Sequence, residues 1–117
     1  MAIAPPSSYN QWQGSTKSIL TDREELYYRV WGGKSARRGE WLTPVKPLSQ
    51  SAAKAGLALP PDNAATDYSE VRVPPKTRIQ VGVAGPNFGH PGGWEQVRLL
   101  DRIPRHCFGP PLPVPPP

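Results

Sequence analysis

Apolar and aromatic residues along the chain fall into short segments separated by glycine and proline, which is typical of a β-rich fold. Residues 24–31 are rich in strand formers and end at a Gly-Gly pair, and residues 41–44 form another short apolar segment. Apolar and polar side chains alternate along residues 68–73 and 79–84, which predicts two strands, each with one buried face. We expect these two strands to be neighbours, with a last strand over residues 96–100.

One segment has the composition of a helix. Residues 48–56 are rich in alanine, with Ser49 placed to cap the first turn and Gly56 placed to cap the last. The predicted fold class is therefore α+β, with a small β core, one or few short helices and proline-rich ends.

The chain has 117 residues, enough for one domain with a single modest core. Its 17 prolines and 11 glycines indicate many loops, whereas four tryptophans and four tyrosines argue against a disordered chain. We predict a polar lead-in over residues 1–20, a folded body over residues 21–108 and a proline-rich tail over residues 109–117. Successive prolines favour polyproline II and exclude the tail from the interior of a sheet.

A formal net charge of +5 favours an encounter with an acidic partner or with nucleic acid. The basic residues are dispersed, which is more typical of a solvated surface than of a nucleic-acid groove. The single cysteine, Cys107, excludes a disulfide within the chain and a multi-cysteine zinc site, and we expect no metal. The first residues do not resemble a signal peptide and no segment reaches transmembrane length, so we expect no membrane insertion.

Candidate chemistry lies in the stretch over residues 87–97, where a glycine-rich turn runs into a segment that opens with Glu95 and Gln96. Backbone with so few side chains can adopt positive φ and approach a ligand closely, and a following strand fixes the direction of the next side chains. Arg29 lies far upstream, among the aromatic strand formers. An arginine and a Glu/Gln pair together predict a site for an anionic, sugar-bearing ligand.

The order of these motifs is more specific than any one of them. Tyr-Tyr-Arg-Val-Trp-Gly-Gly precedes Trp-Leu-Thr-Pro, the Ser/Ala helix, two strands and Phe-Gly-His-Pro-Gly-Gly, with Gln96 close behind. Over about residues 24–104 the chain thereby resembles polymorphic bacterial toxin domains of the ADP-ribosyltransferase fold, in particular the Rhs-type group that modifies elongation factor Tu. Its Pro-Gly-Gly-x-x-Gln end is also similar to the tuberculosis necrotizing toxin type of NAD glycohydrolase.

The resemblance implies a split β-sheet core that binds NAD+ as its substrate. Arg29 matches the family arginine that contacts the NAD phosphates or the nicotinamide ribose, although the residues alone equally allow it to pair with Glu25. Gln96 stands where the family glutamate binds the ribose; it can hydrogen-bond a hydroxyl but carries no charge. Glu95 would point to the opposite face of a strand unless a bulge exchanges the two. The expected catalytic residues are therefore Arg29 and Gln96, with Glu95 as the alternative.

Further residues are expected to bind NAD+. Thr43 or Ser49 would supply the supporting hydroxyl of the family, although Thr43 equally suits a turn and Ser49 a helix cap. The set is completed by a histidine that can donate to phosphate and by rings that can stack on nicotinamide or adenine: His90, Phe88, Trp94 and either Tyr27 or Tyr28.

By resemblance, the domain is an antibacterial toxin that cleaves NAD+ and transfers ADP-ribose to a target protein, with elongation factor Tu as the leading target. It would be the C-terminal part of a larger effector, delivered into the cytoplasm of a target bacterium. Its partner would be a cognate immunity protein with acidic residues that face this basic surface.

Three alternatives stay open from the sequence. The first is an NAD glycohydrolase on the same fold, with water in place of the protein acceptor. The second is a basic ribonuclease toxin that uses His90 or His106 with a nearby carboxylate. The third is an interaction module whose proline-rich tail enters an aromatic groove of a partner.

Overall fold

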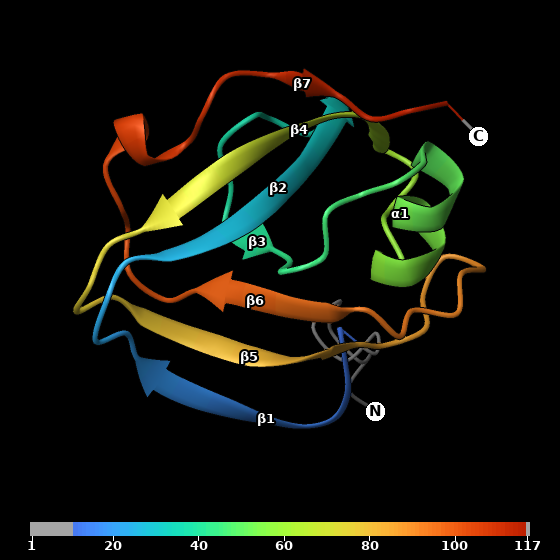
Figure 1. Cartoon of the computed structure of the whole chain (residues 1–117). Coiled ribbons are helices and arrows are strands. Elements are labelled where there is room, and N and C mark those ends of the chain that lie inside the picture. Colours follow the sequence, from blue (N-terminus) through green and yellow to red (C-terminus); the bar gives the residue numbers. More distant parts are fainter. Residues whose placement is uncertain (1–10, 117) are drawn as a thin grey trace.

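The computed structural model describes residues 11–116 and contains two antiparallel β-sheets and one α-helix. One sheet has the strand order β1 (Trp12–Leu20), β5 (Arg78–Ala84), β6 (Glu95–Leu99) and β3 (Trp41–Leu42). The other has the order β2 (Glu25–Gly33), β4 (Asn63–Val73) and β7 (Leu112–Pro113). The helix α1 (Gln50–Leu57) lies at one end of the two sheets, and the short 3-10 helix η2 (Arg105–Cys107) lies toward the other (Figure 1). The predicted small α+β fold is thus confirmed, and its strands form two sheets.

The expected pairing of the strands over residues 68–73 and 79–84 is wrong. These segments belong to β4 and β5, which lie in different sheets. The Pro74-Pro75-Lys76 turn carries the chain from one sheet to the other instead of folding it back into a hairpin, and the link from β1 to β2 crosses at the same end (Figure 1). Alternation predicts a strand with one buried face, but it does not identify the neighbouring strand.

Thr21 ties these two crossings together and is 2% exposed. Its hydroxyl donates to Pro74 O at 2.8 Å and accepts from Thr77 N at 2.9 Å, and its carbonyl accepts from Lys76 N at 2.7 Å. Buried polar groups need such partners, so these bonds fix the path of both connections.

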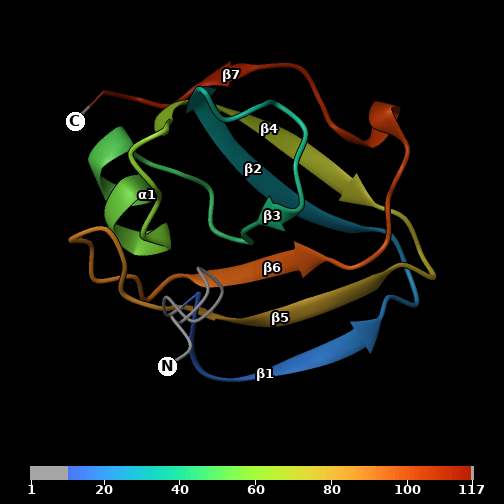
Figure 2. The same cartoon turned by 180° about the vertical axis from the view of Figure 1, so that it is seen from behind.

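The N-terminal part of the chain differs from the predicted lead-in over residues 1–20. Residues 12–20 form β1, which pairs with β5 from Trp12↔Ala84 to Leu20↔Arg78. The strand lies at the outer edge of its sheet, and most of its residues are exposed, so it carries no apolar alternation (Figure 2). Residues 1–10 lie outside the described part of the chain.

The proline-rich tail packs on the body and is no separate element. β7 pairs with the edge of β4 through Asp67↔Pro113 and Tyr68↔Leu112, so the tail is excluded from the sheet interior, as its composition predicts. Val114 is nevertheless 2% exposed, and its N–H donates to Thr66 O at 3.0 Å.

Two apolar clusters form the core. The larger joins the sheets through residues of β3, β4, β5 and β6 and of the 103–108 segment: Leu42, Val71, Val73, Ile79, Val97, Leu99, Ile103, Cys107 and Phe108. The smaller packs the helix and the tail on β2 and β4: Val30, Ala53, Ala65, Tyr68 and Val114. The core therefore reaches into the segment that was predicted to be a tail.

The helix begins as predicted and ends differently. Ser49 is its N-cap, and the Ser49 hydroxyl accepts a hydrogen bond from Ala52 N at 3.0 Å. Ala58, in the left-handed conformation with φ 49°, ends the helix, so the prediction that Gly56 caps it is wrong. Gly56 lies inside the last turn. This position requires glycine because an added Cβ would lie 2.4 Å from the Trp94 ring.

Candidate functional site

A cleft of about 360 Å³ lies where β2, β3 and β6 meet the connection from α1 to β4. We call it the Gln96 cleft. Its lining comes from both sheets, from the helix end and from the glycine-rich loop: Gln11, Arg29, Ser35, Trp41, Leu57, Ala58, Leu59, Pro60, Asn63, Gly85, Asn87, Phe88 and Gln96. Three of the predicted site residues, from distant parts of the sequence, meet here: Arg29, Phe88 and Gln96.

Arg29 extends from β2 toward the loop between β2 and β3. Its two terminal nitrogens donate to Trp41 O at 3.3 Å and to Ala36 O at 3.0 Å. Its Nε is buried and has no hydrogen-bond partner among residues 11–116. Burial lowers the pKa of the guanidinium and nearby Glu40 raises it, and an arginine stays protonated in proteins. A positive charge is therefore held at the wall of the cleft.

The alternative role of Arg29, an ion pair with Glu25, is not observed. The Glu25 carboxylate instead accepts a hydrogen bond from the Tyr27 hydroxyl at 2.5 Å. Burial, together with this bond, raises the pKa of Tyr27.

Gln96 is the second residue of β6 and is 7% exposed. Its side-chain nitrogen donates to Gln11 O, and this carbonyl also accepts from Gly85 N at 3.3 Å. No hydrogen bond to the Gln96 amide oxygen is found within residues 11–116. The amide is thus held through its nitrogen, and its oxygen can still accept a hydrogen bond.

Glu95 is exposed and does not line the cleft. The strand alternation therefore places Gln96, and not Glu95, in the Gln96 cleft, and no bulge reverses the two. The Glu95 backbone links β6 to β3, because its carbonyl accepts a 2.7 Å hydrogen bond from the hydroxyl of Thr43, which directly follows β3. No carboxylate lines the cleft within residues 11–116.

The glycine-rich loop holds Phe88 over the cleft. Asn87 and His90 pair through two backbone hydrogen bonds of 3.1 and 2.8 Å, so Phe88 and Gly89 form a two-residue hairpin turn. Both turn residues have positive φ, 52° and 77°, as a type I′ turn requires. Phe88 is 49% exposed, a high value for so large an apolar side chain.

The second half of the loop is tied to the end of the helix. Gly92 N donates to Ala55 O at 2.9 Å, and Trp94 N donates to Gly56 O at 3.0 Å. Gly92 has φ 71°, and a Cβ there would lie 2.4 Å from Ala84 O, so the close approach requires glycine. Both carbonyls belong to the last turn of the helix, where that of Ala55 also accepts from Ala58 N at 3.3 Å.

Five other predicted binding residues lie outside the lining of the Gln96 cleft. Their contacts in the structure stabilise the fold. Tyr28 packs edge-on against Tyr68 with ring centroids 5.9 Å apart. Thr43 is fully buried and also accepts a hydrogen bond from Val45 N at 3.1 Å. Ser49 caps α1 and Trp94 covers Gly56, whereas His90 closes the hairpin turn with its backbone.

Sequence reasoning missed the lining residues Trp41 and Asn63. The Trp41 ring packs against Trp12 with centroids 5.5 Å apart and planes tilted by 49°, and the Arg98 guanidinium lies over it, 5.2 Å from its centroid. Asn63 is 4% exposed, and its side chain donates to Val30 O at 3.1 Å and accepts from Ala65 N at 2.9 Å. Asn63 follows two prolines and an aspartate, a pattern that predicts only a turn, so the local sequence does not indicate that Asn63 lines the cleft.

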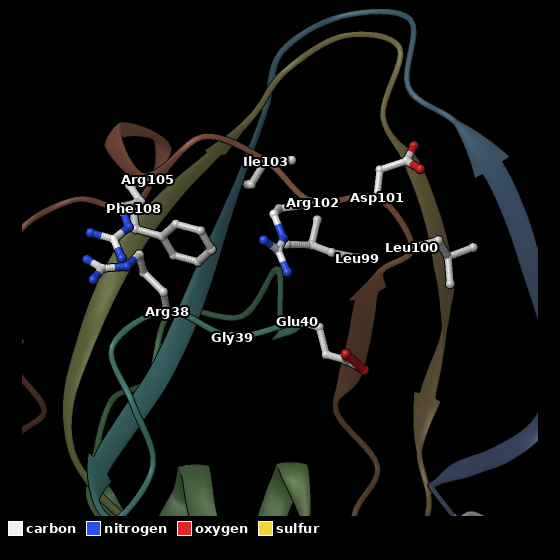
Figure 3. Close-up of a pocket in the computed structure, with 10 residues that line it drawn as sticks. All are labelled: Arg38, Gly39, Glu40, Leu99, Leu100, Asp101, Arg102, Ile103, Arg105 and Phe108. Atoms are coloured by element: carbon white, nitrogen blue, oxygen red, sulfur yellow. The ribbon is translucent and has the colours of Figure 1, made fainter.

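A larger cleft of about 490 Å³ lies elsewhere, between the 38–40 and 99–108 segments, and contains none of the predicted site residues (Figure 3). Within residues 11–116, no group of three histidine, cysteine or acidic side chains is arranged to hold a metal ion. No helix in this part of the chain is long and apolar enough to cross a membrane.

No known family model matches the chain, and no curated protein matches it significantly in sequence. Its fold is similar to that of a chain in the solved structure of Tne2 in complex with Tni2, with a TM-score of 0.71. The match covers 89% of this chain and 98% of that chain at 20% sequence identity. The two chains therefore share a fold over nearly their whole lengths.

Proposed function

We propose that this chain is a toxin domain that cleaves NAD+ to ADP-ribose and nicotinamide, with water as the acceptor. The observation that carries the proposal is the convergence of Arg29 and Gln96, from two different sheets, on one cleft under Phe88. By resemblance, Gln96 takes the position of the glutamate that a classical transferase would use, and the neighbouring Glu95 is exposed and does not line the cleft. This combination favours the glycohydrolase alternative over transfer to a protein.

The groups of the cleft suit a dinucleotide. The Arg29 guanidinium offers a positive charge and a buried N–H without a partner within residues 11–116, which match a phosphate oxygen. The Phe88 ring supplies an exposed face on which nicotinamide can stack. The cleft volume is near the lower end of the range of roughly 300–1,000 Å³ for ligand sites, so we expect it to hold the nicotinamide ribose and to leave the adenosine nearer solvent.

In the proposed reaction the bond between C1′ of the ribose and the nicotinamide nitrogen breaks. Its electron pair goes to the nitrogen, and neutral nicotinamide leaves an oxocarbenium-like ribose. The Gln96 oxygen accepts a hydrogen bond from a ribose hydroxyl and orients the sugar through the transition state. A water oxygen then forms the new bond to C1′ and loses a proton to solvent, because no carboxylate lines the described cleft.

The toxin role rests on the resemblance of the motifs and on the fold shared with the Tne2–Tni2 structure. That structure contains a complex of two proteins, and we propose that this chain likewise has a cognate immunity partner with an acidic face. The domain would act in the cytoplasm of a target bacterium after delivery as part of a larger effector.

The proposal is tested by incubating the purified chain with labelled NAD+ and a bacterial lysate and measuring nicotinamide, ADP-ribose, labelled protein and intact RNA. Release of both products in equal amounts without protein labelling supports the glycohydrolase. Labelling of one discrete protein, such as elongation factor Tu, would identify a transferase. Unchanged NAD+ together with RNA degradation would favour the ribonuclease.

A further inference from the structure

The cleft in Figure 3 shares no lining residue with the Gln96 cleft. Three arginines line it, from the loop before β3 and from the segment after β6: Arg38, Arg102 and Arg105. We call it the three-arginine cleft. All three side chains are exposed, and none forms an ion pair within residues 11–116. Three like charges that line one concavity attract an anionic group.

Two carboxylates also line this cleft, but each is neutralised by an arginine that is not part of the lining. Glu40 accepts from Arg98 Nε at 2.6 Å. Asp101 accepts from Arg78 through a pair of bonds at 2.6 and 2.9 Å, and these bonds lower the pKa of Asp101. In Figure 3 both carboxylates point away from the three guanidinium groups. The field inside the cleft is therefore set by the three arginines.

The floor of the cleft is apolar. Leu99, Ile103 and Phe108 line it and belong to the larger core cluster, and Leu100 is 41% exposed at the rim. Apolar side chains beside three cations fit a ligand that combines an aliphatic group with negative charges.

We propose that the three-arginine cleft docks an acidic segment of a partner protein, with carboxylates on the arginines and an aliphatic side chain on the floor. Arginine pairs with carboxylates through two parallel hydrogen bonds, which suits glutamate and aspartate side chains. Single-stranded nucleic acid is less well matched, because it needs exposed aromatic rings for stacking and Phe108, the aromatic residue of this lining, is 7% exposed. This proposal does not depend on NAD+ cleavage.

The test is fluorescence anisotropy with a labelled peptide that alternates glutamate and leucine, at low salt and without NAD+. The cleft variant carries Arg38→Gln, Arg102→Gln and Arg105→Gln. The matched control carries Lys17→Gln, Arg23→Gln and Lys46→Gln, which removes the same charge from exposed positions outside the cleft. Thermal unfolding of both variants is compared with that of the unchanged chain, because all six positions are exposed and should tolerate glutamine.

We expect the peptide to bind the unchanged chain and the control equally and the cleft variant at least about tenfold more weakly. Replacing the leucines with serine should weaken binding as well, and saturating NAD+ should leave it unchanged. Equal binding to the cleft variant and the control, or absence of binding to the unchanged chain, would overturn the proposal. So would displacement of the peptide by NAD+, or tighter binding of an oligo-dT strand that the cleft substitutions abolish. None of these four outcomes bears on NAD+ cleavage, which is measured separately.

Discussion

Arg29 and Gln96 lie on strands of different sheets and line the same cleft, 67 positions apart in the printed sequence (96 − 29). Arg29 is held by the Ala36 carbonyl of the β2–β3 loop and the Trp41 carbonyl of β3, and Gln96 by the Gln11 carbonyl beside the glycine-rich loop. The two side chains are thus fixed before any ligand binds. Preorganised groups of this kind favour a transition state because they do not have to reorient during the reaction.

Replacing Gln96 with alanine should lower NAD+ cleavage by about 10²-fold, because the ribose loses a positioned hydrogen-bond partner. The measurement is the rate of nicotinamide release under saturating NAD+. Glu95→Gln is the matched control: its side chain is exposed on the opposite face, so the rate should stay within about twofold. A larger loss in the Glu95 variant than in the Gln96 variant would exchange the two roles.

Arg29→Lys keeps a positive charge but loses the planar fork that reaches both Ala36 O and Trp41 O. Without the bonds to these two carbonyls the charge is no longer held in place for an NAD+ phosphate, so KM for NAD+ should rise by roughly tenfold or more. Steady-state kinetics measure this change. Arg72→Lys, on an exposed arginine that pairs with Glu24, is the control. If KM moves equally in both variants, Arg29 has no direct part in binding the dinucleotide.

The sequence predicts local structure here better than it predicts pairing. The Ser49 cap and the alternation that separates Gln96 from Glu95 follow from neighbouring residues, and the structure places both as predicted. β1 was missed because an exposed edge strand needs no apolar face, and the partners of β4 and β5 were misassigned because alternation does not specify them.

For the cleft, too, local sequence motifs identify some residues but not those that are placed by contacts distant in sequence. The motif order pointed to Arg29, Phe88 and Gln96, which the fold brings to one cleft. Trp41 and Asn63 enter that cleft through contacts that are distant in sequence, so no local pattern identifies them. Thr43 and Ser49 have hydroxyls of the expected kind, but their bonds go to Glu95 O and to the helix N-terminus.

Gly56→Ala tests the contact between the helix and Trp94. An added Cβ would lie 2.4 Å from atoms of the Trp94 ring, and the resulting shift should lower the free energy of unfolding by about 1–3 kcal/mol. Thermal or denaturant unfolding measures the loss. Ser51→Ala, at an exposed position of the same helix, should change stability by less than about 0.5 kcal/mol. Equal stability of the Gly56 variant would show that the ring can move aside.

Removal of residues 110–117 should destabilise the domain, because it deletes β7 and the buried Val114 side chain. Val114→Ala alone should cost about 2 kcal/mol through loss of buried apolar groups. Denaturant unfolding measures both variants. Removal of Pro116 and Pro117 alone, which leaves β7 and Val114 in place, is the control and should leave the midpoint unchanged. Full stability after removal of residues 110–117 would show that this segment does not stabilise the domain.

The buried Cys107 thiol should make the stability of the domain depend on pH. Cys107 is 8% exposed, and burial raises its pKa above its ordinary value. The neutral thiol is favoured in the folded state, so its contribution to stability is complete below the unfolded pKa of about 8.5 and is lost as pH rises toward the folded pKa. Stability should therefore fall more steeply above about pH 8.5 in the unchanged chain than in Cys107→Ala.

Urea unfolding at a series of pH values measures both, with thiol labelling as the check that Cys107 reacts slowly in the native protein. Parallel pH profiles, or rapid native labelling, would show that the thiolate forms without opening the core.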